Sequence, residues 1–265
     1  MKKVLFCLLI GFAITLEASE LEIERLTWAG VRFVTPQTTL LVDAVGQDLW
    51  DGNAPEGLVP VVADTRRRYA LITHIHNDHF DPVTLQAVLG EKGYVIVHED
   101  DATYIASRGF KVIPAQFYKP VSRGGFHMTV VPAVDGFGDN QVNWVIAYNG
   151  KRYFHGGDTL WHGKWAEYGN QFGPFEAAFL PINGARVNTG YLPLSSMVMT
   201  PTNAVDAASL LKAKLLVPIH FGLNDPPNYI EVKEPLKTLK QIAEKQKVHV
   251  QHLKPGEKFK PLGTQ

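Results

Sequence analysis

Residues 73–81 concentrate side chains that bind metal ions. The segment reads THIHNDHFD and places His74, His76, Asp78 and His79 within six positions. Imidazole is a favoured ligand of zinc, iron and other first-row metals, and a carboxylate adds a harder oxygen. Because residues two apart point the same way on an extended chain, His74 and His76 can reach one metal together. Asp78 and His79 follow a step later and can turn toward a second metal.

The neighbouring residues indicate how this segment is held. A single histidine at the end of a strand is usually a structural residue, but packing does not explain three histidines and an acid in so short a span. The hydrophobic run 69–72 predicts a buried strand that ends at the cluster. A helix should begin directly after it, with Asp81 as its cap, Pro82 in its first turn and Gly90 at its end.

Two further segments carry a residue that can bind metal at the end of a buried strand. Residues 153–159 run from a strand into paired glycines and then Asp158. The glycines allow the backbone to approach another group closely. Residues 217–222 carry His220 at the end of a second strand. Each segment is a weak signal by itself, because a lone histidine in such a place is more often structural than a ligand.

The order of the expected elements indicates a layered fold. Early strands form hairpins and later strands alternate with helices, which fits a sandwich of sheets with helices outside. Helices are expected after the Thr200 cap and over 235–245, a loop over 46–60, and a hairpin turn at Asn149-Gly150. The expected strands are 21–34, 39–42, 70–73, 94–98, 126–132, 142–148, 152–154, 177–180 and 215–219.

Composition indicates a globular protein with a large core. Of the 265 residues, 45% are hydrophobic and 20% are charged. Lys plus Arg and Asp plus Glu both number 26, so no net charge attracts nucleic acid or a membrane surface. The basic cluster at 66–68 is expected to be a solvated turn before a strand.

The first residues have the pattern of a signal peptide. Two lysines precede an apolar run over 4–16, which is too short for a comfortable membrane span. Cleavage after Ala18 would remove residues 1–18 and leave 19–265 as a single domain, exported to the periplasm or secreted. The alternative is an uncleaved anchor, which would then be the membrane contact. The single cysteine, Cys7, lies in the apolar run, so metal ligands must come from His, Asp and Glu.

Taken together, these motifs resemble those of the metallo-β-lactamase-fold hydrolases. The resemblance is carried by THIHNDH from Thr73, GDT at 157–159 and PIH at 218–220, in the family's order and spacing. It implies an α+β fold, a four-layer αββα sandwich. Within the superfamily, LPI at 180–182 and MTPTNAV at 199–205 resemble the branch that contains ascorbate-6-phosphate lactonase and N-acylphosphatidylethanolamine phospholipase D.

The resemblance also implies two divalent metal ions, with zinc as the expected ion and manganese or iron as alternatives. Asp43 would orient one of the ligands. The implied ligands are His74 and His76 for the first metal; Asp78, His79 and His220 for the second; and Asp158 for both.

The chain departs from the family at the first metal. The third histidine expected there corresponds to Asp135, in the segment VPAVDG at 131–136. An aspartate can bind zinc or iron, but it adds a negative charge that should weaken the Lewis acid and favour a harder ion. A second departure is Val198, where related lactonase-like and phospholipase-like sequences often carry a histidine. The substrate of neither relative is therefore carried over.

The resemblance implies hydrolysis of an ester, lactone or phosphodiester bond in a small-molecule or lipid-like substrate by a metal-activated hydroxide. Asp78 is the expected residue to orient the nucleophile and take its proton. Trp161 and His162, with the nearby Trp165 and Tyr168, could line the substrate site, and Arg186 could bind an anionic group. Two alternatives stay open: a metal-binding protein with weak or no catalysis, and a relative with iron-dependent oxidoreductase chemistry.

Overall fold

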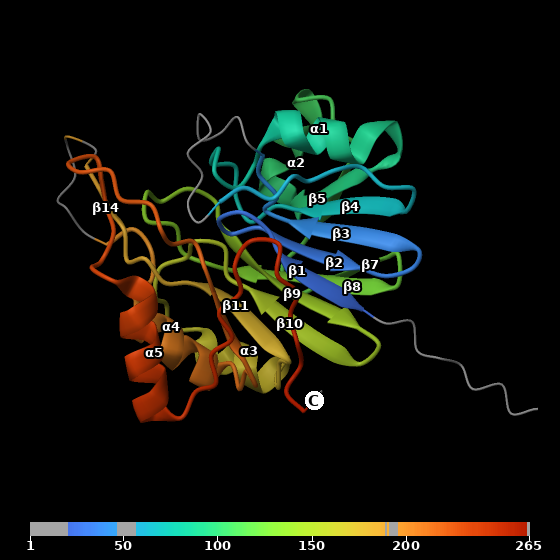
Figure 1. The fold of residues 1–265 in the computed structure, drawn as a ribbon. Helices are drawn as coiled ribbons and strands as arrows, with labels where there is room; N and C mark the ends of the chain where they lie inside the picture. Colours follow the sequence, from blue (N-terminus) through green and yellow to red (C-terminus); the bar gives the residue numbers. More distant parts are fainter. Residues whose placement is uncertain (1–20, 47–56, 189, 191–195, 264–265) are drawn as a thin grey trace, which may run out of the picture.

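The fold is described from a computed structural model that covers residues 21–46, 57–188, 190 and 196–263 (Figure 1). The expected signal peptide and most of the expected loop over 46–60 lie outside these residues. The described chain forms two six-stranded sheets and a two-stranded ribbon. No helix within it combines the length and the apolar character that a membrane span requires.

The first sheet supplies one half of the sandwich, in the order β1-β2-β3-β4-β5-β6. Its first three strands pair antiparallel, and β3 to β6 pair parallel. The carboxyl ends of β3 and β4 therefore lie at one edge, where Asp43 and the histidine cluster follow. The strands are β1 (Glu22–Arg25), β2 (Val31–Val34), β3 (Thr38–Val42), β4 (Arg67–Leu71), β5 (Tyr94–His98) and β6 (Val112–Ala115).

The second sheet has the order β13-β11-β10-β9-β8-β7. Strands β10, β11 and β13 pair parallel, and the others antiparallel. Asp158 follows β10 and His220 follows β13, so both lie at the same edge. The strands are β7 (Pro120–Arg123), β8 (Phe126–Pro132), β9 (Val142–Tyr148), β10 (Lys151–His155), β11 (Ala177–Pro181) and β13 (Leu216–Ile219).

Helices cover the outer face of each sheet. Figure 1 places α1 and α2 over the first sheet and α3, α4 and α5 against the second. This confirms the α+β fold and the αββα order of layers. The helices are α1 (Pro82–Leu89), the 3-10 turn η2 (Gly90–Lys92), α2 (Glu99–Ser107), α3 (Trp165–Gln171), α4 (Pro201–Leu210) and α5 (Pro235–Gln246); the ribbon pairs β12 (Arg186–Val187) with β14 (Tyr229–Ile230).

Alternating side chains along each strand build the three apolar layers of the sandwich. Leu40 and Val42 of β3 enter the core between the sheets, while Leu41 enters the layer under α1 and α2. In β10, Tyr153 faces the core between the sheets and Phe154 packs under the helices of the second sheet. One strand therefore serves two hydrophobic layers, which explains the nearly unbroken apolar runs in the sequence.

The expectation of one strand over 21–34 was wrong. The segment is a hairpin, in which β1 and β2 pair antiparallel across a tight turn. In that turn Gly30 N donates to Thr27 O at 2.9 Å, and Trp28 has a φ of 59°, in the left-handed region. Trp28 and Leu26 are buried in the turn, so their apolar character hid the break between the two strands.

The local signals for turns and caps were correct. Asp81 Oδ1 accepts hydrogen bonds from Val83 N and Thr84 N at the start of α1. Thr200 forms a reciprocal capping box with Asn203 at the start of α4. Asn149 and Gly150, both with positive φ, join β9 to β10. The short strands β6, β7, β12 and β14 were not predicted.

The contact between α3 and α4 gives a test of this packing. A Cβ placed on Gly169 of α3 would lie 1.9 Å from the backbone oxygen of Leu210, whereas one on Gly163 would meet nothing within 4 Å. Gly169→Ala should therefore destabilise the protein by about 2 kcal/mol or more, although alanine favours helix. Gly163→Ala should change the free energy of unfolding by no more than about 0.5 kcal/mol. Urea unfolding of both variants measures this; equal stabilities would contradict the packing.

Candidate metal centre

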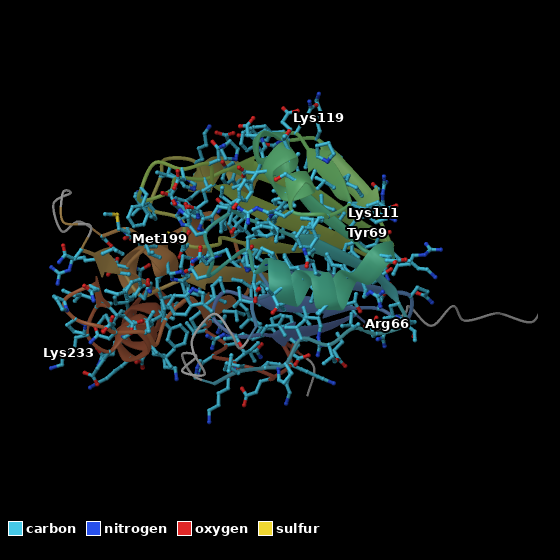
Figure 2. The ribbon with its side chains drawn as sticks, turned by 90° about the horizontal axis from the view of Figure 1, so that it is seen from above. Arg66, Tyr69, Lys111, Lys119, Met199 and Lys233 are labelled. Carbon is cyan, nitrogen blue, oxygen red and sulfur yellow. The ribbon has the colours of Figure 1, made fainter. Side chains whose placement is uncertain are left out.

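The candidate site lies where the carboxyl ends of parallel strands from both sheets meet. In Figure 2, Met199 lies on the opposite side of the molecule from Arg66 and Tyr69, which mark the start of β4. Met199 N donates to Thr159 O, next to Asp158, so this is the site end. The contributing segments follow β3 (Asp43), β4 (residues 73–79), β8 (residues 133–141), β10 (Asp158) and β13 (His220).

The two oxygens of the Asp158 carboxylate face different histidines. Its Oδ1 is 3.6 Å from His74 Nε2. Its Oδ2 is 3.8 Å from both His79 Nε2 and His220 Nε2. Asp78 Oδ2 also lies near these two histidines, at 3.5 Å from His79 Nε2 and 3.4 Å from His220 Nε2. One carboxylate thus contacts His74 through one oxygen and the group of Asp78, His79 and His220 through the other.

Unsatisfied buried nitrogens indicate that this arrangement fits a metal. The Nε2 atoms of His74, His79 and His220 are buried, and none has a hydrogen-bond partner in the described chain. Burying such an atom without a partner costs roughly 1–3 kcal/mol. A divalent cation that binds between these nitrogens and the facing carboxylates would remove this cost.

The structure brings all seven predicted ligands into one region. Potential ligand atoms form overlapping groups of three, and the atoms of each group lie within 4.8 Å of one another. Asp135 joins such a group with His76 and Asp139. The groups are His74, His76 and Asp78; His74, His79 and Asp158; Asp78, His79 and His220; and His76, Asp135 and Asp139.

Asp43 orients His79 through a hydrogen bond to the ring nitrogen that does not face the site. Its Oδ2 accepts hydrogen bonds from His79 Nδ1 at 2.8 Å and from the Thr73 hydroxyl, and its Oδ1 accepts one from the Thr73 backbone N. With Nδ1 protonated, Nε2 is the nitrogen that faces the site. Burial would lower the pKa of His79, but the carboxylates of Asp78, Asp158 and Asp43 outweigh it and raise that pKa well above its usual value.

Trp28 orients Asp78, a role that the sequence did not reveal. Its Nε1 donates to Asp78 Oδ2 at 3.0 Å, and its ring lies 4.0 Å from the His220 ring. Trp28 reaches this place because the turn between β1 and β2 carries it there. No separate signal marks this residue in the sequence, since it lies within an apolar run.

The connection between β8 and β9 contacts ligands of both groups. Gln141 Nε2 donates to Asp158 Oδ1 at 2.7 Å, and Asp139 Oδ2 lies 3.0 Å from His76 Nε2. Asp139 can therefore hold Nε2 of His76, which leaves Nδ1 to face the site. Both contacts were missed, although a short polar connection next to the expected third ligand was a signal for them.

Asp135, which stands in the sequence where the family's third histidine was expected, has one carboxylate oxygen available to bind a metal. Its Oδ2 accepts hydrogen bonds from the backbone N atoms of Phe137 and Asp139, and its Oδ1 lies 3.9 Å from His76 Nδ1. Burial raises the pKa of Asp135, and the nearby Asp158 carboxylate adds to this effect. A cation between these two carboxylates would relieve their mutual repulsion.

His155 does not face the site. It is fully buried, its Nε2 donates to Ala29 O at 2.8 Å, and its Nδ1 accepts from Gly157 N at 3.2 Å. Burial lowers its pKa, which keeps the ring neutral. His155 thus ties the turn that carries Trp28 to the loop that carries Asp158.

The structure separates the predicted substrate residues. His162 stacks on Trp165 with ring centroids 4.1 Å apart, and burial together with Lys164 lowers its pKa to about 4. Trp165 and Tyr168 belong to the buried core under the second sheet, so they pack rather than line a site. Trp161 is 42% exposed. Arg186 is exposed on β12 and makes no ion pair with a described residue.

Comparisons with known proteins place the chain in a family. The model of the beta-lactamase superfamily domain matches residues 38–221. A UPF0173 metal-dependent hydrolase of Exiguobacterium sp. is 33% identical over 171 residues, which are 61% of this chain and 70% of that protein. One of Thermus thermophilus is 28% identical over 239 residues, 86% of this chain and 96% of that protein.

The chain belongs to the UPF0173 metal-dependent hydrolases of the beta-lactamase superfamily. As a member of this family it is a metal-binding enzyme that hydrolyses a small-molecule substrate. An isothiocyanate hydrolase from Delia radicum gut bacteria has the same fold, with a TM-score of 0.69 at 18% identity over 90% of this chain and 98% of that chain.

The hydrogen bond between Asp43 and His79 generates a prediction about metal affinity. In Asp43→Asn an amide group can face His79 Nδ1, which favours the proton on Nε2, the nitrogen that should bind metal. Zinc affinity should fall about 10- to 100-fold, as for other residues that orient metal ligands. Competition with a chelator measures it. Asp64→Asn is the control, because Asp64 also accepts hydrogen bonds, from Thr39 and Arg66, but lies before β4. Equal zinc affinity in both variants would contradict this role of Asp43.

Proposed function

We propose that this hydrolase uses two divalent metal ions, zinc by expectation, to cleave an ester, lactone or phosphodiester bond. The observation that carries the proposal is the Asp158 carboxylate, whose Oδ1 faces His74 and whose Oδ2 faces His79 and His220, all three with an unpartnered Nε2. When bound, the ions would supply Lewis acidity and lower the pKa of a water molecule toward neutrality. We propose His74, His76 and Asp135 as ligands of the first ion; Asp78, His79 and His220 as ligands of the second; and Asp158 as the ligand of both.

Asp78 is the residue that we assign to the nucleophile. Its contacts with Trp28, His79 and His220 all use Oδ2, and Oδ1 has no hydrogen-bond partner among the described residues. Burial opposes ionisation of Asp78, but the facing histidines outweigh it and hold its pKa well below the usual value. An ionised oxygen that is free to accept a hydrogen bond can orient a water molecule and receive its proton.

We propose that the substrate contacts two segments. One carries Trp161 and His162 and follows the Asp158 loop, and the other is the ribbon of β12 and β14, which carries Arg186. At neutral pH the lowered pKa of His162 makes its ring a neutral hydrogen-bonding group. Arg186 would then be the positively charged group that attracts an anionic part of a small or lipid-like substrate.

The place of action is proposed from the sequence. The lysines and the apolar run at the start of the chain support a signal peptide over residues 1–18 and export to the periplasm or the medium. Cleavage would leave residues 19–265 as the mature domain.

The proposed chemistry is tested with substrates of the three bond classes: 4-nitrophenyl esters, γ-lactones and bis(4-nitrophenyl) phosphate. The metal-loaded enzyme should turn over at least one class, lose the activity with a chelator and regain it with zinc or manganese. Asp78→Asn should lower kcat about 10²- to 10⁴-fold, because it removes the proposed proton acceptor. Two bound metals without turnover of any class would contradict the proposal and favour a metal-binding role.

Asp135 provides a second test, directed at the identity of the metal. Asp135→His removes one negative charge beside Asp158, so the variant should retain more zinc relative to manganese. Its activity should also reach half-maximum at a lower pH, because a less negative ligand set makes the ions stronger Lewis acids. Metal analysis after growth in equal zinc and manganese, with pH–rate profiles, measures both effects.

The control for this test is Asp206→His on α4, which changes the same charge at a position where the side chain accepts a hydrogen bond from Gln246. If the metal content and the pH–rate profile of Asp135→His match those of the wild type and this control, Asp135 does not tune the metal.

A further inference from the structure

Asn183, two residues after the end of β11, lies between the two loops that carry proposed ligands. In the second sheet β11 pairs on one side with β10, before Asp158, and on the other with β13, before His220. The register pairs Pro181 with Ile219, so Asn183 lies at the height of these loops. Asn183 is fully buried. A buried amide at this edge needs hydrogen-bond partners, and those partners define its role.

The hydrogen bonds of Asn183 fix the orientation of its amide. Its Oδ1 accepts from Ala185 N at 3.3 Å, so the amide nitrogen must point the other way. There Nδ2 donates to the hydroxyl oxygen of Tyr229 at 2.6 Å. The backbone O of Asn183 also accepts from Val232 N at 2.9 Å, which holds the segment of Tyr229 against this edge.

The Tyr229 hydroxyl keeps its own proton available. Because the oxygen accepts the bond from Asn183, the O–H group can donate to another atom, and it donates to no residue in the described part of the chain. The ring is held by the core between the sheets and by the cluster of Ala185, Met197 and Val198. Burial raises the pKa of Tyr229, and the Asp78 and Asp158 carboxylates raise it further. The phenol is therefore protonated at neutral pH, and it lies close enough to Asp78 and Asp158 to feel their charges.

We propose that Tyr229 donates a hydrogen bond to the substrate oxygen that gains negative charge during hydrolysis, with Asn183 as its positioning residue. The inference rests on the proposed hydrolytic function. A fixed donor near the reacting centre stabilises developing negative charge without having to reorganise, which is the most effective way in which a hydrogen bond lowers a barrier. Tyr229 thus supplies a neutral donor to a site whose proposed metal ligands are carboxylates and imidazoles.

Binding of inorganic phosphate, a tetrahedral anion, tests the inference without any need for turnover. Calorimetric titration of the zinc-loaded protein should show about 10- to 100-fold weaker phosphate binding in Tyr229→Phe, as expected for the loss of a hydrogen bond to an anion. Tyr153→Phe is the control, because Tyr153 is also a buried tyrosine but packs in the core between the sheets, in the middle of β10; its phosphate affinity should match the wild type. Equal affinities in Tyr229→Phe and the wild type, or no phosphate binding by either, overturn the inference.

A double-mutant cycle tests the role of Asn183. In Asn183→Asp a carboxylate would accept the Tyr229 O–H and turn its proton away from the substrate. Asn183→Asp should therefore weaken phosphate binding in the wild-type background and have little further effect in Tyr229→Phe. Equal losses in both backgrounds would mean that the added charge alone acts, and would overturn the positioning role.

Kinetics separate this inference from the proposed function. With 4-nitrophenyl acetate, Tyr229→Phe should lower kcat about 100-fold, with KM changed less than about threefold, since the bond forms as charge develops. An unchanged kcat in an active enzyme overturns the inference alone. Phosphate binding that depends on Tyr229, in a protein that cleaves none of the three bond classes, overturns the proposed function and leaves Tyr229 as an anion-binding residue.

Discussion

The site depends on the free-energy cost of burying carboxylates where the edges of the two sheets meet. Asp43 is fully buried, and Asp78 and Asp158 face histidines on several sides. An unpaired buried charge costs several kcal/mol, so each carboxylate requires donors or a cation close by. Asp43 is satisfied within the protein by Thr73 and His79. Among the described residues Asp158 accepts one hydrogen bond, from Gln141, and we propose that its remaining capacity serves the two ions.

The same edge also holds the two sheets together. Trp144 Nε1 of the second sheet donates to Ile72 O after β4, and Val142 N donates to Thr73 O. On the other side, His155 and His220 donate to backbone oxygens of Ala29 and Trp28. Apart from the backbone N of His220, these bonds join residues that lie near the ligands in sequence rather than the ligands themselves. The ligand side chains are thereby mounted on a rigid frame, which is what preorganised metal binding requires.

The site residues that could be predicted from the sequence share one property, which is their position after a buried strand. Asp158, His220 and the cluster after β4 stand directly after buried strands, and a strand fixes where the next residue lies. The order of early hairpins and later strands that alternate with helices likewise indicated the layers of the fold. Residues such as Trp28 and Gln141 could not be found in this way, because they reach the site through turns and connections whose course depends on the whole sandwich. Asn183 and Tyr229, 46 positions apart in the sequence, meet only through the tertiary fold.

We propose that Asp135 completes a first metal position beside the one formed by Asp78, His79 and His220. Anomalous diffraction from crystals of the zinc-loaded protein measures this directly. We expect two metal peaks, with Asp158 between them and Asp135 Oδ1 at about 2.0–2.2 Å from the first ion, as for other zinc carboxylates. A single peak, or two peaks with Asp135 still bound only to the backbone of its own loop, would contradict it.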